Sequence, residues 1–213
     1  MSGYHDSGPV DCTGSINPAN LKDKTALVTG GASGIGKEYV RALAKAGVHV
    51  VIADLNEDNG KKVQQETSGS TTFVRCDVTS WDDQLAAFKK AKEFSPNNEV
   101  DIVVANAGIT AQDQVFENDI DKDEPEKPAV PVHDINATGV LWTTKLAIFY
   151  FRKQNATNKK DRSLILQSSL AGYLDLIGAP QYTSGKFFVR GLMRAFRRSE
   201  ISHGIRVNVI APW

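Results

Sequence analysis

The amino-acid sequence predicts an α/β fold in three layers, with helices on both faces of a doubly wound parallel sheet. Short runs rich in Val, Ile, Leu and Thr alternate along the chain with stretches whose apolar residues recur every three or four positions. Several of the short runs are apolar at nearly every position, as is typical of parallel strands that are covered on both faces. The repeated β-α order then requires right-handed crossovers between the strands.

This pattern predicts each element in turn. The expected strands cover residues 24–30, 48–54, 71–77, 100–108, 163–169 and 205–212. The expected helices cover residues 36–47, 57–67, 81–94, 140–154 and 182–201. Residues 1–20 contain no apolar run long enough for a signal peptide, so we expect a flexible N-terminal tail followed by one domain over residues 21–213.

Composition excludes several classes of protein. The 25 basic and 25 acidic residues cancel, so the overall charge gives no general attraction to nucleic acid or to an anionic membrane. Cys12 and Cys76 lie far apart and have no neighbouring Cys or His at ligand spacing, which argues against a disulfide framework or a zinc site. No segment approaches the roughly 18 apolar residues of a membrane helix. We therefore expect a soluble, cytoplasmic protein without a metal.

A long polar segment interrupts the regular alternation at residues 112–132. It is acidic and rich in proline, so it is unsuited to the core. Two interpretations remain open, namely a loop close to a functional site and a plain solvated insertion.

A glycine-rich turn joins the first expected strand to the first expected helix. The residues TGGASGIG at 29–36 include Gly30, Gly34 and Gly36. The first two can adopt backbone conformations closed to other residues, and the third allows the helix to pack close to the strand. The N–H groups at the start of that helix favour a pyrophosphate. The turn therefore predicts nucleotide binding, although the strict G-x-G-x-x-G is absent and a plain strand-to-helix connection is the alternative.

An acid ends the second expected strand. Asp54 lies 18 residues beyond Gly36, close to the offset of about 20 residues at which a carboxylate meets the adenosine ribose. A carboxylate there accepts hydrogen bonds from both ribose hydroxyls and repels a 2′-phosphate. Asp54 therefore favours NAD(H) over NADP(H), the alternative being an acid that simply ends a strand.

Tyr182 and Lys186 lie four residues apart in the last expected helix. This spacing places both side chains on one face. Free tyrosine has a pKa near 10, and a neighbouring ammonium favours the phenolate, so the pair can act as an acid or a base. Taken alone, Y-x-x-x-K is common on solvated helix faces, and its significance depends on the accompanying motifs.

The motifs, taken in order, resemble the short-chain dehydrogenase/reductase family in its non-extended subgroup. T-G-x-x-x-G-x-G begins at Thr29, and N-A-G occupies residues 106–108, with Ala105 in place of a further asparagine. Ser169 lies 13 residues before Tyr182, which is the family's spacing for a catalytic serine. The resemblance covers about residues 21–213 and implies a Rossmann fold.

The resemblance implies a catalytic set and a reaction. Asn136, Ser169, Tyr182 and Lys186 are the expected catalytic residues, with Ser168 the less favoured of the two serines. Hydride transfer to or from a nicotinamide would interconvert a secondary alcohol and a ketone. Tyr182 would exchange the hydroxyl proton and Ser169 would bind the substrate oxygen. Lys186 would bind the nicotinamide ribose and lower the tyrosine pKa, and Asn136 would hold a water of the proton relay.

The resemblance also implies a set of cofactor-binding residues, with NAD expected and NADP the less favoured dinucleotide. Ser33 stands where many NADP-using relatives have a basic residue, and Asp77 with Val78 follows the third strand, where the family holds the adenine. The full expected set is Thr29, Gly30, Ser33, Gly34, Ile35, Gly36, Asp54, Asp77, Val78, Asn106, Ala107, Gly108, Tyr182, Lys186 and Pro212.

Residues 95–109, 163–175 and 205–213 are most similar to fungal family members of the hydroxyprostaglandin- or hydroxyaverantin-dehydrogenase-like type. This implies a fairly apolar small-molecule alcohol or ketone and assembly as a homodimer or homotetramer through residues 133–155 and 180–200. Relatives continue beyond the position of Trp213, so we expect a sheet without its last strand and substrate-covering lobe. A truncated, non-catalytic nucleotide-binding remnant is the alternative to an active enzyme.

Overall fold

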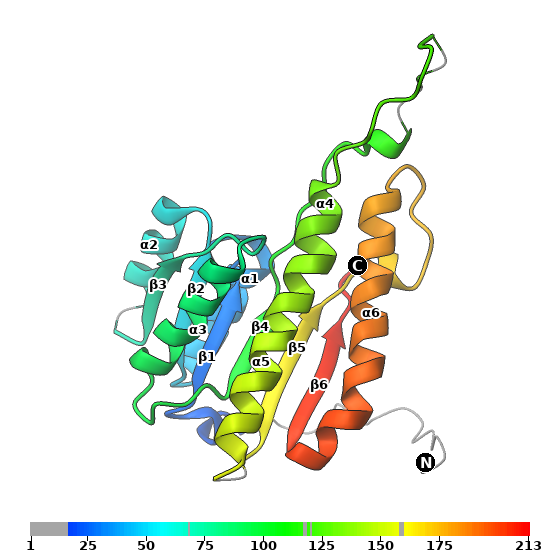
Figure 1. Ribbon diagram of the computed structural model, residues 1–213. Helices are drawn as coiled ribbons and strands as arrows, with labels where there is room; N and C mark the ends of the chain where they lie inside the picture. Colours follow the sequence, from blue (N-terminus) through cyan, green and yellow to red (C-terminus); the bar gives the residue numbers. More distant parts are fainter. Residues whose placement is uncertain (1–16, 68, 117–118, 120, 158–159) are drawn as a thin grey trace.

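A computed structural model describes residues 17–67, 69–116, 119, 121–157 and 160–213. Within these ranges the chain forms one six-stranded parallel sheet with the strand order β3-β2-β1-β4-β5-β6 (Figure 1). The predicted doubly wound, Rossmann-like α/β fold is confirmed. Most of the predicted tail, residues 1–16, lies outside the described residues, and Pro18–Leu21 form a short 3₁₀ helix.

The strands and helices follow the predicted order, with ends that differ by a few residues. The strands are β1 (Thr25–Thr29), β2 (His49–Asp54), β3 (Thr71–Arg75), β4 (Ile102–Ala105), β5 (Arg162–Gln167) and β6 (Ile205–Ile210). The helices are α1 (Gly34–Lys45), α2 (Glu57–Glu66), α3 (Trp81–Phe94), α4 (Pro131–His133), α5 (Val140–Asn155) and α6 (Pro180–Glu200). The expected absence of a last strand and of a substrate-covering lobe stays a prediction.

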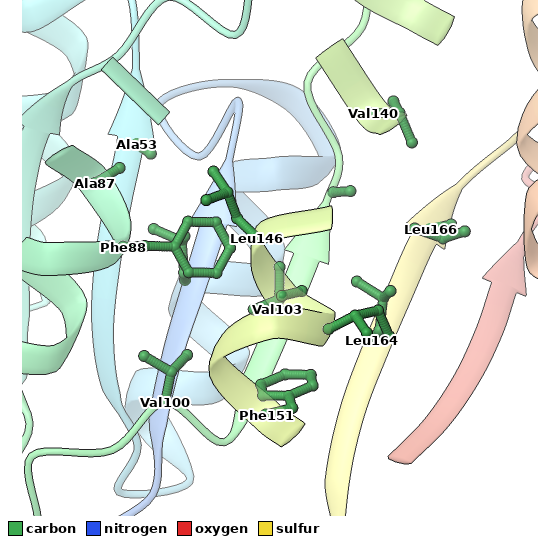
Figure 2. Packing of buried hydrophobic residues seen from close by; sticks show 14 of the residues in the cluster. Ala53, Ala87, Phe88, Val100, Val103, Val140, Leu146, Phe151, Leu164 and Leu166 are labelled. Atoms are coloured by element: carbon green, nitrogen blue, oxygen red, sulfur yellow. The ribbon is translucent and has the colours of Figure 1, made fainter. Parts of the chain in front are cut away.

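Alternate residues of each strand face opposite layers of helices. On β1, Leu27 packs into a core cluster shared with α3, α5 and α6, and Phe88 and Phe151 are its large aromatic members (Figure 2). The next residue, Val28, packs on the other face with Val40 of α1. Because both faces are covered, β1 is buried at every position, which explains its continuous apolar sequence.

The strand order reverses direction between β1 and β4. The chain builds outward from β1 to β3, and then returns through α3 to place β4 on the other side of β1. The loops that follow β1 and β4 therefore diverge and leave a crevice at the carboxyl edge of the sheet, where ligands bind in folds of this kind. The glycine-rich turn and the N-A-G motif meet at this edge.

A π-helical turn, Asp134–Gly139, joins α4 to α5. Asn136 lies within this wider turn, directly before α5. Such turns contain an extra residue in the helical hydrogen-bond ladder and occur frequently at functional sites. The described residues between β4 and α4 extend beyond the ends of the strands, above α5 and α6 (Figure 1).

No helix in the described part of the chain combines the length and the apolar character needed to cross a bilayer.

Candidate functional site

A pocket of about 500 Å³ lies at the carboxyl edge of the sheet, over the divergence of β1 and β4. Most of the residues expected to bind cofactor or to catalyse the reaction line this pocket. They are Gly30, Ser33, Gly34, Ile35, Gly36, Asp54, Asp77, Val78, Asn106, Ala107, Gly108, Ser169, Tyr182, Lys186 and Pro212. Two expected residues, Thr29 and Asn136, do not line it and lie in the layer beneath.

The glycine-rich turn is too tight for side chains at two positions. Gly30 has a φ of +65°, and a Cβ there would lie 2.8 Å from the Cα of Ala107. A Cβ on Gly36 would overlap the carbonyl oxygen of Gly30. The turn therefore brings the start of α1 against the end of β1, and Ser33 at the helix N-cap makes no side-chain capping bond. Backbone N–H groups of α1 consequently face the pocket, where they suit a pyrophosphate.

Thr29 supports this edge from below. Its Oγ1 accepts hydrogen bonds from the backbone N–H groups of Asn106 and Ala107, both at 3.1 Å. The Nδ2 of Asn106 in turn donates to the carbonyl oxygens of Thr29 and Gly30, at 3.0 and 3.1 Å. These bonds fix the N-A-G segment against the glycine-rich turn, so Thr29 is placed to shape the pocket through its neighbours.

Asp54 lies at the end of β2 with both carboxylate oxygens held by backbone groups. Its Oδ2 accepts from the N–H of Ala32 and its Oδ1 from the N–H of Asn56, each at 2.9 Å. The first bond connects the acid directly to the glycine-rich turn. The carboxylate keeps further acceptor capacity toward the pocket, since each oxygen has two lone pairs.

Asp77 and Val78 form the adjoining wall after β3. The Oδ1 of Asp77 accepts from the N–H and the hydroxyl of Thr79, at 2.8 and 2.7 Å. The carbonyl of Val78 accepts from the side chain of Gln84, and its own side chain is nearly buried. Together they present a short apolar surface bordered by fixed polar groups, which suits a flat heterocyclic ring.

Tyr182 and Lys186 lie one helical turn apart on α6 and face the same side. The Nζ of Lys186 is 5.4 Å from the centre of the Tyr182 ring. Lys186 is only 4% exposed, and burial lowers its pKa to about 8. Its Nζ donates to the carbonyl of Gln167 at the end of β5, at 3.1 Å. The ammonium is thus held beside the phenol by a neutral acceptor and has donor capacity left for a ligand.

Asn136 approaches the same point from the π-helical turn. Its Oδ1 accepts from the N–H of Ile109 at 2.9 Å, and its Nδ2 donates to the carbonyl of Ile109 at 2.8 Å. A methyl group added to Gly108 would lie 3.1 Å from Asn136 Oδ1 and 3.4 Å from Lys186 Nζ. Gly108 therefore lets the amide and the ammonium approach one another.

The two serines after β5 differ in their environment. Ser168 is buried, and its hydroxyl donates to the backbone carbonyl of Lys186 at 2.9 Å, so it anchors the strand end to α6. Ser169 is only partly buried and its Oγ accepts from the N–H of Ala171 at 3.2 Å, which leaves the hydroxyl proton available. The backbone on either side of Ser169 is held by β6, because Ser168 N–H and Leu170 N–H donate to the carbonyls of Ile210 and Pro212.

Sequence reasoning missed several residues of the pocket. Gln167 provides the carbonyl that holds Lys186, and Ile109 provides both backbone partners of Asn136. Both act through main-chain atoms, which no residue pattern identifies. Leu55 and Cys76 also line the pocket, each beside a residue that was predicted to do so. Burial and the neighbouring acids raise the pKa of Cys76 to about 12, so its thiol stays protonated.

The residues present fit a dinucleotide. The crowded glycines form a backbone cradle, and Asp54, Ser169 and the Tyr182–Lys186 pair line the same pocket. In the described ranges, no group of three or more His, Cys, Asp or Glu side chains is suited to a metal ion. The arrangement can hold a phosphate-containing ligand and exchange a proton with a small molecule beside it.

Comparisons with known proteins agree with this geometry. The chain is 39% identical over 213 residues to 5'-hydroxyaverantin dehydrogenase of Dothistroma septosporum, a match covering 93% of this chain and 69% of that protein. It is 33% identical to the NADP-dependent dehydrogenase of Cochliobolus lunatus, over 90% of this chain and 71% of that protein.

The fold also matches solved structures. The 3-ketoacyl-(acyl-carrier-protein) reductase of Brucella melitensis, solved with NADH, superposes with a TM-score of 0.79 at 26% identity, over 90% of this chain and 76% of that one. A model of the short chain dehydrogenase family matches residues 24–213, which include the whole sheet and every pocket residue named above. The chain therefore belongs to the short-chain dehydrogenase family of oxidoreductases.

Proposed function

We propose that this protein is an NAD-dependent oxidoreductase that interconverts a secondary alcohol and a ketone, with Tyr182 as the acid/base. One observation carries the proposal. The Tyr182 ring and the Lys186 ammonium face each other at 5.4 Å in the same pocket as the glycine-rich turn and Ser169. A bound nicotinamide dinucleotide would supply the hydride chemistry.

The residues of the pocket would divide the work of positioning and proton transfer. Ser169 donates a hydrogen bond to the substrate oxygen, and Tyr182 takes the hydroxyl proton in oxidation or returns it in reduction. Lys186 favours the phenolate by its positive charge and holds the nicotinamide ribose with its remaining N–H groups. Asn136, bound at both ends by Ile109, fixes the backbone beside Lys186 and borders a path for protons to solvent.

The proposed preference for NAD rests on charge. Asp54 is the acid at the ribose end of the pocket, and Lys186 is the only Lys or Arg among the described residues that line it. A 2′-phosphate beside Asp54 would meet a negative charge with no cation opposite, whereas a ribose hydroxyl would donate to it. The relative from Cochliobolus lunatus is named as NADP-dependent, so the preference has to be measured for this chain.

The proposed substrate is a fairly apolar alcohol or ketone. Ile109 and Ile135 line the pocket beside the N-A-G motif and give it apolar surface there. The long helices α5 and α6 remain the proposed surfaces for a homodimer or homotetramer.

Calorimetric titration with NAD and NADP, followed by an NADH absorbance assay against a panel of secondary alcohols, tests the proposal. We expect NAD to bind more tightly than NADP and turnover with at least one apolar alcohol. Binding without turnover across the panel would reject the enzymatic function and favour a nucleotide-binding remnant. A Tyr182→Phe variant should keep NAD affinity and lose most of the turnover, and parent-like turnover in this variant would reject the role of Tyr182.

A further inference from the structure

The catalytic helix α6 begins without a cap of its own. The residue before its first turn, Ala179, offers no side-chain acceptor, and the helix starts at Pro180. The backbone N–H of Gln181 instead donates to Oδ2 of Asp113, at 2.7 Å, from 68 residues earlier in the chain. A carboxylate at this position satisfies an orphan helix donor and is favoured by the helix dipole. Asp113 thus caps the helix from another segment.

A second pair of bonds extends the contact to the side chain. Gln181 Nε2 donates to Oδ1 of Asp113 and to the carbonyl of Ala129, both at 3.0 Å. The N–H of Ala129 donates to the side-chain oxygen of Gln114 at 2.7 Å. These bonds bring together the two ends of the polar segment between β4 and α4. Asp113 at one end and Ala129 at the other are both bonded to Gln181 of α6. We call Asp113, Gln181 and the carbonyl of Ala129 the clamp.

The clamp is buried and charged. Asp113 is 7% exposed and Gln181 is 6% exposed. Although desolvation raises the pKa of Asp113, hydrogen bonds from the backbone and side chain of Gln181 and from Val115 N–H lower it overall, so the carboxylate stays ionised. The Oε1 of Gln181 is also buried and has no hydrogen-bond partner among the described residues. An apolar side chain of similar volume would avoid this cost but would leave the Asp113 carboxylate and the Ala129 carbonyl each short of a donor, so the glutamine at this position is explained by the clamp.

The position of the clamp suggests its role. Gln181 immediately precedes Tyr182, and the first turn of a helix frays readily when its end is not fixed. An error of about 1 Å in the position of a catalytic group can cost on the order of 100-fold in rate. We infer that Asp113 and Gln181 are positioning residues that fix the first turn of α6 and thereby hold Tyr182 toward Lys186 and Ser169. This inference rests on the proposed role of Tyr182.

A Gln181→Leu variant tests the inference without altering charge. It removes both side-chain bonds of the clamp, keeps the Asp113 carboxylate and removes the unpartnered oxygen. We expect kcat to fall by about 10-fold or more, while KM for NAD stays within about 2-fold, because the dinucleotide cradle lies on other elements. The urea midpoint should fall slightly, because the Asp113 carboxylate and the Ala129 carbonyl each lose a buried donor. Asp123→Asn, an exposed acid of the same segment, is the matched control and should leave kcat unchanged.

Exchanging donor and acceptor provides a rescue. Asp113→Asn places an amide opposite an amide and should lower kcat by about 10- to 100-fold. In Asp113→Asn/Gln181→Glu, the asparagine can donate to the new carboxylate and still accept from the N–H of residue 181, whereas the carbonyl of Ala129 loses its donor, so part of the lost kcat should return. An unchanged kcat in both single variants, or a KM effect alone, would overturn the inference.

A structural readout separates this inference from the proposed function. Amide hydrogen exchange of the peptide that contains Tyr182, followed by mass spectrometry, reports how firmly the first turn of α6 is held. In Gln181→Leu, exchange in this peptide should be faster by about 10-fold, whereas a peptide from α3 should exchange as in the parent. If the parent has no turnover but the faster exchange occurs, the proposed function fails and the clamp stands. If exchange of the Tyr182 peptide is the same in both proteins, the clamp falls whatever the parent's turnover.

Discussion

Two buried cations lie at opposite ends of β5, and they are stabilised in different ways. Arg162, at the start of the strand, is fully buried and pairs with Asp101 and with Glu99, the latter at 3.0 Å. Lys186 lies beside the end of the strand, where its Nζ meets only the carbonyl of Gln167 and, in the described residues, no carboxylate within ion-pair distance. Burial therefore lowers the pKa of Lys186 to about 8.

The two edges of the sheet therefore differ in whether a buried positive charge has a counter-ion. At the amino edge the guanidinium is neutralised, and its Nε also donates to Asn155 on α5, so the charge connects strand to helix. At the carboxyl edge the ammonium is left without a counter-ion, which costs stability but keeps the charge available for a phenolate and a ribose.

The largest expected effect concerns Arg162. Replacing it by methionine, Arg162→Met, leaves the buried Asp101 without its ion-pair partner and leaves Glu99 with Lys160 alone, so the free energy of unfolding should fall by about 3–5 kcal/mol. Urea denaturation measures this loss. Arg206→Met is the matched control, because Arg206 pairs with Asp161 where both side chains are about half exposed, and it should cost less than about 1 kcal/mol. Equal losses in the two variants would contradict the comparison.

Replacing Lys186 by methionine at the carboxyl edge should lower turnover without lowering stability. In Lys186→Met we expect kcat to fall by about 100-fold or more, because the phenol of Tyr182 loses the charge that favours its ionised form. Stability should stay level or rise, since a desolvated ammonium is replaced by an apolar group. Parallel measurement of turnover and of the urea midpoint checks both halves. A large loss of stability would show that Lys186 is structural, like Arg162.

The lowered pKa of Lys186 gives a pH dependence of known sign. The pKa of Lys186 is lower in the folded protein than in the unfolded chain, so between these two pKa values the unfolded chain binds more protons. The free energy of unfolding is therefore reduced at low pH and rises through pH 8 toward the unfolded pKa. Between neutral pH and pH ~9.5 the gain should be about 1–2 kcal/mol.

Urea titrations of Tyr182→Phe and Tyr182→Phe/Lys186→Met measure this gain without interference from the phenol. The gain should occur in the first variant and vanish in the second. If the free energy of unfolding rises equally with pH in both variants, Lys186 is not the cause of the rise.

The smallest expected effect concerns Asp54. In Asp54→Asn the charge at the ribose end is removed and one acceptor oxygen is kept, so affinity for NADP relative to NAD should rise by about 10-fold. Calorimetric titration with both dinucleotides gives the ratio. Asp58→Asn, an exposed acid in the first turn of α2, should leave the ratio unchanged. An unaltered ratio in Asp54→Asn would show that other residues select the dinucleotide.

Much of the fold was predictable because its signals are local. The buried strands read as continuous apolar runs, and α3 begins and ends at Trp81 and Phe94 as predicted, since Ser80 accepts from the N–H of Asp83 at its start. The glycine-rich turn was also recognisable from its sequence. Neighbouring backbone atoms leave no room for a side chain at Gly30 or Gly36, so only glycine fits these positions. In each case a few adjacent residues contain the physical reason.

The remaining features depend on contacts between distant segments. The cap of α6 comes from Asp113, and the acceptor of Lys186 is the backbone of Gln167, whose side chain accepts from Tyr39 on α1. The π-helical turn at Asn136 adds one residue to a helix whose periodicity gives no sign of it. Such features follow from tertiary packing, which overrides local preference and leaves no pattern in a single sequence.

The strand order has a consequence for synthesis on the ribosome. The strands β1 to β4 are contiguous in both sequence and sheet, so the nucleotide-binding turn and its N-A-G support can assemble as soon as β4 has left the exit tunnel. The backbone around Ser169 cannot be fixed at that stage, because the carbonyls that bond its neighbours belong to Ile210 and Pro212. We expect the nascent chain to order the glycine-rich turn and the N-A-G segment first and to fix Ser169 only with the arrival of β6.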